Sequence, residues 1–599
     1  MVQTNHTFHI PVMGTGHSID SPIRVGQLGI DSVISVVDDI LCEKIRKYYS
    51  ELYDLPYQSI ARSEIDGRAL RITAYLDTVN EIVEKKFNDL KNLPFFSGSE
   101  KDHYFNLMPD SSVLRQAYDY LAGLKSDGSF TKKANELTEM MVSGSIDVNI
   151  MSKVDALRVS KNSGDKDPIF SDASAALRGY ANSKLNSALV LSAGFNPRLY
   201  SYLAEFKDFY RNQAGEIKKK IVLKVSDFRS ALIQGKFLAK KGLEIAEFRI
   251  ESGLNCGGHA FVSDGLLLPV LLKEFRDKRD ELVENFKPLI TSFYESNGWG
   301  DRLVGQKVAE PKITVQGGIG THGEVRRLMD DYQMDATGWG SPFLLVPEAT
   351  CVDSETEKLL ADAEDRDLYL SNVSPLGVPF NNIRGSGAQI FTIQKAREGN
   401  PGSACPKEFL VTNTEFTEEP ICTASSQYQL LKIKQIEESD KSELEKEAEK
   451  ERVIEKSCLC VNLGSGALIR LGLEKPSYGR QEICPGPNIA WFNRTYSLKE
   501  MADHIYGRSE SLVSEDRPHM FAKEIELYVD YMESGLKDID SESSEFKKLD
   551  KMRKNIEEGM EECLMISDQK AYKDENLESI KWTVEKQRER LNKIFSMTA

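Results

Sequence analysis

The sequence lacks the marks of a membrane-inserted or exported protein. None of its 599 residues lies in a run of roughly 20 apolar residues, the length that a membrane-spanning helix needs. The first residues, from Met1 to His6, show no basic segment leading into an apolar one, as a signal peptide would. The nine cysteines are irregularly spaced, which is not typical of a disulfide framework. We therefore expect a cytoplasmic protein.

An excess of basic residues is also missing. The chain has 77 Lys and Arg residues against 93 Asp and Glu residues, a formal net charge of −16. Nucleic acids and anionic membranes are bound through clustered Lys and Arg side chains, so we expect neither as a partner. The hydrophobic content of 40% and the charged content of 28% are typical of a soluble globular protein.

The first 350 residues alternate short apolar runs with helical stretches. Alternating strands and helices predict a parallel sheet, and eight repeats predict a (β/α)8 TIM barrel, in which the binding residues follow the carboxyl ends of the strands. The eight runs are Phe8–Met13, Ser32–Val37, Ile146–Met151, Ala188–Ala193, Ile221–Val225, Ile245–Ile250, Lys312–Gln316 and Met334–Gly338.

Two parts of the chain depart from this alternation. Residues 40–145, between the second and third runs, contain two helical stretches (Ile40–Leu55 and Gly67–Leu93), and we expect a helical insertion over the barrel mouth. Beyond residue 350 the alternation is lost. The predicted fold is therefore α/β: a barrel domain (1–350) with this insertion, followed by a mixed extension. The extension divides into an irregular, cysteine-bearing part (351–495) and a helical C-terminal region (496–599).

Paired glycines end the seventh and eighth runs. Gly317 and Gly318 follow one, and Gly340 and Ser341 follow the other. Glycine lets backbone N–H groups approach an anion, and the helix that opens near Thr321 adds a positive dipole end. Two such strand ends side by side are typical of a phosphate site like the one that holds flavin mononucleotide (FMN). Two ordinary glycine turns are the alternative.

The same loop also matches a dinucleotide fingerprint, because Gly318, Gly320 and Gly323 spell G-x-G-x-x-G between a strand and a helix. That fingerprint requires an acidic residue near the end of the next strand, to bind a ribose. The next strand instead ends in Gly338-Trp339-Gly340. The dinucleotide interpretation therefore fails.

A histidine follows the sixth run, in Cys256-Gly257-Gly258-His259. Gly257 and Gly258 leave room for a flat ring close to the backbone. A histidine beside such a ring can move a proton, because its pKa lies near neutrality. The alternative is a loop histidine bonded to backbone carbonyls. Lys224, at the end of the fifth run, is placed to face the pyrimidine edge of a flavin.

These segments together resemble the nitronate monooxygenase (2-nitropropane dioxygenase-like) family of FMN-dependent enzymes, whose relatives include FMN-type enoyl reductases. The resemblance covers roughly residues 8–350 without the insertion, and implies a barrel whose strand ends hold FMN. The matching stretches are Ile10–Gly14, Leu223–Ser226, Cys256–His259, Gly317–Ile319 and Gly338–Phe343.

The resemblance also implies which residue acts in catalysis and which residues bind the cofactor. His259 would be the catalytic base. The chain has Ser341-Pro342-Phe343 where the family often has Thr-Arg-Phe, and family members are little more than half as long. The implied cofactor-binding residues are Met13, Gly14, Lys224, Gly257, Gly258, Gly317, Gly318, Gly340 and Ser341.

Five of the nine cysteines lie within 80 residues of the extension, from Cys405 to Cys484. Thiolates on turns can ligate an iron–sulfur cluster that would pass electrons to a flavin, but the spacing matches no C-x2-C-x2-C run. Zinc would require paired C-x2–4-C ligands, and Cys458-Leu459-Cys460 is too tight. Buried, unligated thiols are the third interpretation. The five candidate metal ligands are Cys405, Cys422, Cys458, Cys460 and Cys484.

The sequence thus predicts an FMN-dependent oxidoreductase resembling nitronate monooxygenase, with a small organic substrate and His259 as acid or base. The cofactor carries the electron transfer and the protein supplies binding and proton movement. Two alternatives stay open. One is an FMN-dependent enoyl-type reductase fed by an iron–sulfur cluster, and the other is a non-catalytic barrel scaffold in a larger assembly. A homo-oligomer is compatible with each of them.

Overall fold

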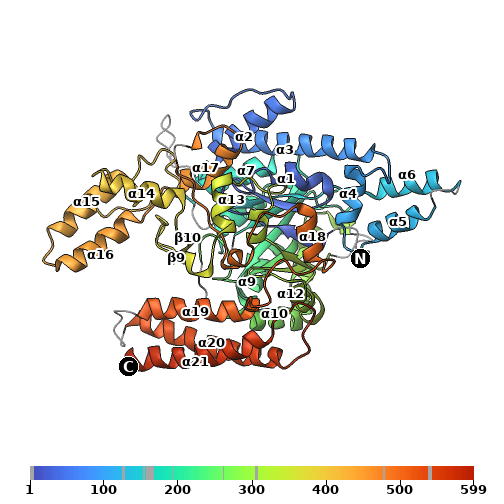
Figure 1. Cartoon of the computed structure of the whole chain (residues 1–599). Helices are drawn as coiled ribbons and strands as arrows, with labels where there is room; N and C mark the ends of the chain where they lie inside the picture. The colour runs from blue at the N-terminus through green and yellow to red at the C-terminus, as the bar shows by residue number, and fades with distance from the viewer. Residues whose placement is uncertain are drawn as a thin grey trace.

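The chain forms one barrel with two large additions (Figure 1). None of the helices in the described part of the chain is long and apolar enough to cross a membrane. The computed structural model describes residues 6–124, 128–152, 155–156, 168–192, 194–260, 262, 264–303, 308–476, 479–536 and 543–598.

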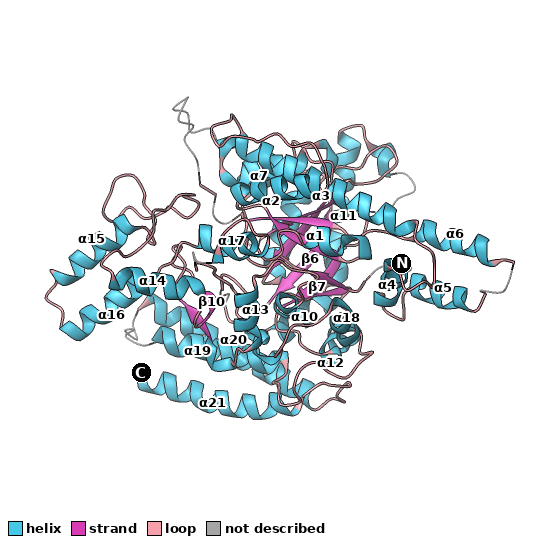
Figure 2. Cartoon of the chain, turned by 45° about the horizontal axis from the view of Figure 1, so that its top comes forward, coloured by secondary structure: helices cyan, strands magenta, loops and turns pink. Residues whose placement is uncertain are grey.

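Eight parallel strands close into the barrel in sequence order, and β8 pairs with β1 through Thr337 and Phe8. Figure 2 shows these strands in magenta, surrounded by helices. The predicted TIM barrel and all eight strands are confirmed, although Ala193, at the end of the fourth predicted run, lies outside the described residues. The strands are β1 (Phe8–Ile10), β2 (Asp31–Ser35), β3 (Ile146–Ile150), β4 (Ser187–Leu191), β5 (Lys219–Val225), β6 (Ile245–Glu251), β7 (Lys312–Gln316) and β8 (Ala336–Gly338).

Helices cover the outside of the barrel. Successive strand residues point alternately outward, toward these helices, and inward. In β6, Phe248 and Ile250 are fully buried and alternate with the charged residues Glu247, Arg249 and Glu251. The helices that connect the strands, besides those of the insertion, are α1 (Ser21–Val25), α7 (Asp172–Ala181), α8 (Pro197–Leu203), α9 (Phe228–Ala239), α10 (Leu268–Asp277), α11 (Arg279–Ser296) and α12 (His322–Arg326).

The barrel interior has an apolar part and a charged part. Val33, Ala188, Val190 and Val222 form a small hydrophobic cluster of their own. On the charged side, the Glu247 carboxylate accepts hydrogen bonds from Arg249 Nε (2.7 Å) and Thr314 Oγ1 (2.5 Å). Burial alone would raise the pKa of Glu247, but Arg249 outweighs burial and the pKa is lowered to about 2. The glutamate therefore stays ionised inside the barrel.

The insertion between β2 and β3 is helical, but it does not cover the mouth. Of the pocket-lining residues that the structure describes, none belongs to 40–145. Tyr104 Oη donates to Val142 O (3.0 Å) and accepts from Val142 N (3.1 Å), just before β3 begins. The part of the insertion around Tyr104 therefore reaches the opposite, amino-terminal end of the barrel. Arg62 and Arg68 instead contact the extension at Pro406 and Phe409, but they do not line the pocket, so the insertion does not form the cover of the mouth that was expected. Its helices are α2 (Asp39–Leu52), α3 (Gly67–Lys91), α4 (Glu100–Leu107), α5 (Val113–Ala122) and α6 (Phe130–Met140).

Residues 351–495 take the place at the mouth that was expected for the insertion. They contain a two-stranded antiparallel sheet, β9 (Leu368–Ser371) and β10 (Phe380–Ile383). Gly377–Phe380, Leu463 and Cys484 line the pocket at the barrel mouth. The helices of this region are α13 (Ser354–Ala361), α14 (Gly387–Arg397), α15 (Ser426–Glu437), α16 (Glu443–Ile454) and α17 (Leu459–Arg470).

The C-terminal region is helical, as the sequence predicts. It contains α18 (Leu498–Ile505), α19 (Met520–Leu536), α20 (Ser544–Ser567) and α21 (Glu578–Thr598). The last three pack on one another, and α20 also packs on α10 of the barrel (Figure 1). This bundle is therefore attached to the barrel beside strand β6, which α10 follows in the chain.

Candidate active site

A cavity of about 610 Å³ lies at the carboxyl ends of the strands. The loops after the strands supply most of its wall, as expected for a TIM barrel, and residues from 377–380, 463, 484, 488 and 531 supply the rest. The structure brings together in this wall Met13, Gly14, Lys224, Gly257, Gly258, His259, Gly317, Gly318, Gly340 and Ser341, which are all the predicted cofactor-binding and catalytic residues.

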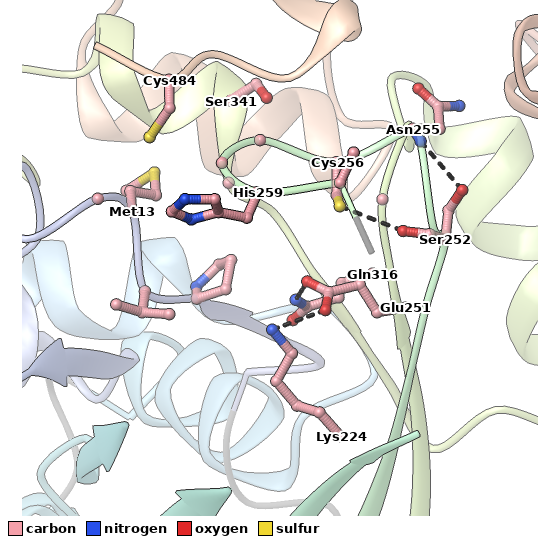
Figure 3. A pocket seen from close by; sticks show the side chains of 18 of the residues that line it. Met13, Lys224, Glu251, Ser252, Asn255, Cys256, His259, Gln316, Ser341 and Cys484 are labelled. Carbon is pink, nitrogen blue, oxygen red and sulfur yellow. Dashed lines mark hydrogen bonds and ion pairs between the residues drawn. The ribbon is translucent and has the colours of Figure 1, made fainter. Parts of the chain in front are cut away.

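Three side chains at adjacent strand ends form a polar network in the wall (Figure 3). Lys224 Nζ forms an ion pair with Glu251 Oε2 (2.6 Å), and Gln316 Nε2 donates to Glu251 Oε1 (2.6 Å). The sequence singled out only Lys224. Glu251 and Gln316 were missed, although each stands at the end of a predicted strand, the position where a barrel places its binding residues.

The two glycine-ended loops line the pocket. Gly317 and Gly318 have φ angles of +111° and +77°, which are accessible to glycine at little cost. Among the hydrogen bonds of the described residues, none uses the amide of Gly318, Ile319, Gly340 or Ser341 as donor. Buried or half-buried N–H groups without a partner are uncommon in proteins. These four are therefore available to an anion.

The helix that opens near Thr321 begins with a capping box. Glu324 Oε2 accepts from the amides of Gly320 (2.7 Å) and Thr321 (3.3 Å), and Thr321 Oγ1 accepts from Glu324 N (3.2 Å). This capping box satisfies the N–H groups that would otherwise face an anion. Whether the helix contributes its dipole to an anion stays a prediction.

His259 lies between the barrel and the extension. Its backbone forms an antiparallel bridge with Phe380, flanked by hydrogen bonds from Asn381 N to Gly258 O (2.9 Å) and from Ala260 N to Pro379 O (2.8 Å). Its Nε2 lies 2.7 Å from Ser374 Oγ. Burial lowers the pKa of His259 from 6.5 to about 4. The imidazole is therefore neutral near pH 7 and able to accept a proton.

The first strand contributes Met13 and Gly14 to the wall. Gly14 has a φ of +56°, and a Cβ atom there would lie 2.9 Å from His17 Cδ2 and 3.6 Å from Cys484 Sγ. Only glycine fits this position. In Figure 3, Met13, Cys484 and His259 occupy one part of the wall, and Lys224, Glu251 and Gln316 another.

Four of the five candidate metal ligands lie near one another. The pKa of Cys422 is raised chiefly by a hydrogen bond with Cys405, and burial adds to this effect. The pKa of Cys460 is raised to about 12, chiefly by burial and to a smaller extent by the nearby Cys458 and Cys405. Cys484 instead lines the pocket. Among the described residues, no three His, Cys, Asp or Glu side chains are placed to hold a metal ion. The predicted iron–sulfur ligands thus find no support in this part of the chain.

The pocket has donor groups and a volume that FMN would require. Four unpartnered amides at two adjacent strand ends suit a phosphate, which binds through backbone N–H groups. Lys224 lines the same cavity. A Cβ atom at Gly258, beside His259, would meet no atom within 4 Å, whereas one at Gly257 would lie 2.5 Å from Cys484 O. A volume of about 610 Å³ lies within the usual range for cofactor and ligand sites.

No protein-family model and no curated protein sequence matches this chain. Several solved structures are similar to it, among them the following three. The enoyl reductase domain of MlnA from Bacillus amyloliquefaciens has 13% identity over 85% of this chain and 95% of its own, with a TM-score of 0.40. A mutant of FabK from Thermotoga maritima has 13% identity, coverages of 67% and 82%, and a TM-score of 0.30.

The nitroalkane oxidase from Streptomyces ansochromogenes has 9% identity over 84% of this chain and 95% of its own, with a TM-score of 0.32. Likenesses at such identity and TM-score say nothing about the activity of this chain. The functional argument therefore depends on the geometry of the pocket.

Proposed function

We propose that this chain is an FMN-dependent oxidoreductase of the nitronate monooxygenase kind, with a small organic substrate. The observation that carries the proposal is the pair of glycine-ended loops, whose amides at Gly318, Ile319, Gly340 and Ser341 have no partner among the residues that the structure describes. When bound, FMN supplies the electron-transfer chemistry, which no protein side chain here can perform.

The residues around the pocket bind the cofactor and exclude water from it. The two glycine loops hold the phosphate, and the strand ends that carry Lys224 and Gln316 hold the pyrimidine part of the ring. The Lys224 charge is compensated by Glu251 at 2.6 Å, so the wall remains close to neutral. Val378, Phe380 and Leu463 from the extension line the same cavity and exclude water from it.

His259 takes a proton from the substrate carbon or returns one to it. Its low pKa, caused by burial, keeps the imidazole neutral and ready to accept. The contact with Ser374 Oγ fixes the orientation of the ring. General acid–base catalysis of this type contributes about 10²- to 10⁴-fold to a rate.

The substrate class can be tested on the purified, flavin-loaded protein in the absence of oxygen. An alkyl nitronate should bleach the flavin absorbance, and oxygen should restore it. An activated alkene given to the chemically reduced protein should restore the absorbance if the chain is instead an enoyl-type reductase. A flavin that responds to neither reagent would contradict an oxidoreductase with this substrate range.

A further inference from the structure

The backbone carbonyls of the phosphate loop, residues 317–321, accept hydrogen bonds from side chains of the C-terminal part of the chain. Arg517 Nη2 donates to Gly318 O (2.5 Å), Asn488 Nδ2 donates to Ile319 O (2.7 Å), and His504 Nε2 donates to Gly320 O (2.9 Å). Three successive carbonyls are thus bound by three separate elements. No residue of the barrel itself takes part in these three bonds.

The contact with Arg517 decides which way one peptide unit faces. A trans peptide directs its C=O and its N–H in opposite directions, and no cis peptide bond occurs among the described residues. Because Gly318 O is bound to Arg517, the N–H of Ile319 must point away from the guanidinium. Ile319 lines the pocket and its amide has no protein partner. Arg517 therefore turns one of the four available amides toward the cavity.

Arg517 is itself rigidly held. The side chain is 4% exposed, and its guanidinium also donates to Asn488 Oδ1 (2.9 Å) and Glu324 Oε1 (2.7 Å). A planar guanidinium can serve three acceptors at fixed angles, which a lysine ammonium on a flexible stem does not reproduce. A Cβ atom at Gly320 would lie 2.4 Å from the Arg517 guanidinium. The loop and the arginine are therefore in direct contact.

Glu324 joins this arginine to the start of the helical bundle. Its Oε1 accepts from Arg517 and from Met520 N (2.7 Å), the first residue of α19. Its Oε2 accepts from Gly320 N (2.7 Å). Burial would raise the pKa of Glu324, but Arg517 and the other donors lower it. The ion pair is thus present throughout the neutral range and links the bundle to the loop.

We infer that Arg517 is a positioning residue for the phosphate of the bound flavin, and that the C-terminal region is a structural part of this anion site. The inference depends on the proposed FMN site and names a residue outside the barrel that the site requires. Arg517 acts through the Gly318–Ile319 peptide and does not itself touch the phosphate.

Paired binding of FMN and riboflavin tests this inference, because the two ligands differ only in the phosphate. Binding to the apoprotein is followed by quenching of flavin fluorescence, without any activity assay. Wild-type protein should prefer FMN. The Arg517→Met variant should bind FMN at least about 10-fold more weakly, the worth of one charge-assisted hydrogen bond. Its affinity for riboflavin should stay within about 2-fold of wild type, as the ring contacts are untouched.

Two further variants separate positioning from folding. Arg517→Lys keeps a cation beside Glu324, so it should fold normally, yet it should still lose part of the preference for FMN. Arg590→Met removes an arginine from α21 that pairs with Asp530 and Glu533, so it perturbs the bundle away from the loop and should bind both flavins as wild type does.

The outcomes distinguish this inference from the proposed function. A wild-type preference for FMN that both Arg517 variants retain in full would overturn the inference and leave the proposed function standing. Equal weakening of FMN and riboflavin would also overturn it, because Arg517 would then act through general stability. A wild-type protein that binds neither flavin would overturn both.

Discussion

The barrel contributes to the pocket through the ends of its strands, whereas residues 351–599 contribute single side chains from several separate elements. Lys224, Glu251 and Gln316 lie beside one another because β5, β6 and β7 are neighbours in the barrel. Ser374 and Arg517 have no such common origin, and each reaches its partner across more than a hundred residues of sequence.

This difference separates two kinds of contribution. The strand ends form the surface that would touch the cofactor, and the C-terminal part fixes the loops that carry this surface. Arg517 binds Gly318 O, and Ser374 contacts His259. The barrel would therefore supply the binding groups and the C-terminal part their orientation. Variants on the two sides should differ in what they change.

The largest effect is expected at His259. His259→Ala should lower kcat by about 10²- to 10⁴-fold, because the proton acceptor is lost, while FMN remains bound. Steady-state kinetics together with the flavin content of the purified variant measure both quantities. His103→Ala, in the insertion, provides a control of the same chemistry. An unchanged kcat would remove His259 from the mechanism, and joint loss of flavin and stability would assign it a packing role.

A somewhat smaller effect is expected at the phosphate loop. Gly318→Val places a Cβ 2.1 Å from Asn255 Nδ2, at a φ of +77° that β-branched residues avoid. FMN affinity should fall by about 100-fold, the worth of one or two charge-assisted hydrogen bonds. Gly298→Val is the matched control, since Gly298 has a φ of +70° and open space around it. Full flavin occupancy in Gly318→Val would contradict the phosphate site.

Part of the fold and of the candidate site could be predicted from the sequence alone. Eight strand runs and the glycines behind them could be identified locally, because a barrel repeats its strands and collects their ends at one face. Glu251 and Gln316 were within reach of the same rule. Ser374 and Arg517 were not, because their partners are set by tertiary packing that leaves no periodic signal. The insertion was expected to cover the mouth, and it does not line the pocket, for the same reason.

The pH dependence should report the environment of His259. Its pKa is lowered from 6.5 to about 4 by burial, so the neutral base persists well below neutrality. The acidic limb of the pH profile of kcat should therefore lie near pH 4 to 5 and be absent from His259→Ala.

Stability should respond in the same pH range. Between pH 6.5 and 4 the unfolded chain binds the proton and the folded chain does not, so His259 lowers the free energy of unfolding as the pH falls through this window. The decline should be shallower in His259→Ala when unfolding is measured in denaturant at each pH. An acidic limb of the kcat profile near pH 6.5 would contradict the burial of this histidine.

The smallest effect on the pocket is expected from the insertion. Tyr104→Phe removes both hydrogen bonds to the backbone of Val142, at a cost of about 1–3 kcal/mol in the free energy of unfolding. FMN affinity should not change, because this contact lies at the end of the barrel away from the pocket. Tyr120→Phe, at an exposed tyrosine in the same insertion, should change neither quantity. A loss of FMN affinity in Tyr104→Phe would place the insertion in communication with the site.

The most direct measurement is the cofactor content of the purified chain. The protein is examined by visible absorption, then denatured, and any released ligand is identified by chromatography and mass spectrometry. The pocket and its four unpartnered amides predict a yellow protein that releases FMN in equimolar amount, or a colourless apoprotein that is incubated with FMN and stays yellow after free FMN is removed by gel filtration. A chain that carries no flavin and cannot be reconstituted with FMN would contradict the central claim and support a barrel that serves as a scaffold.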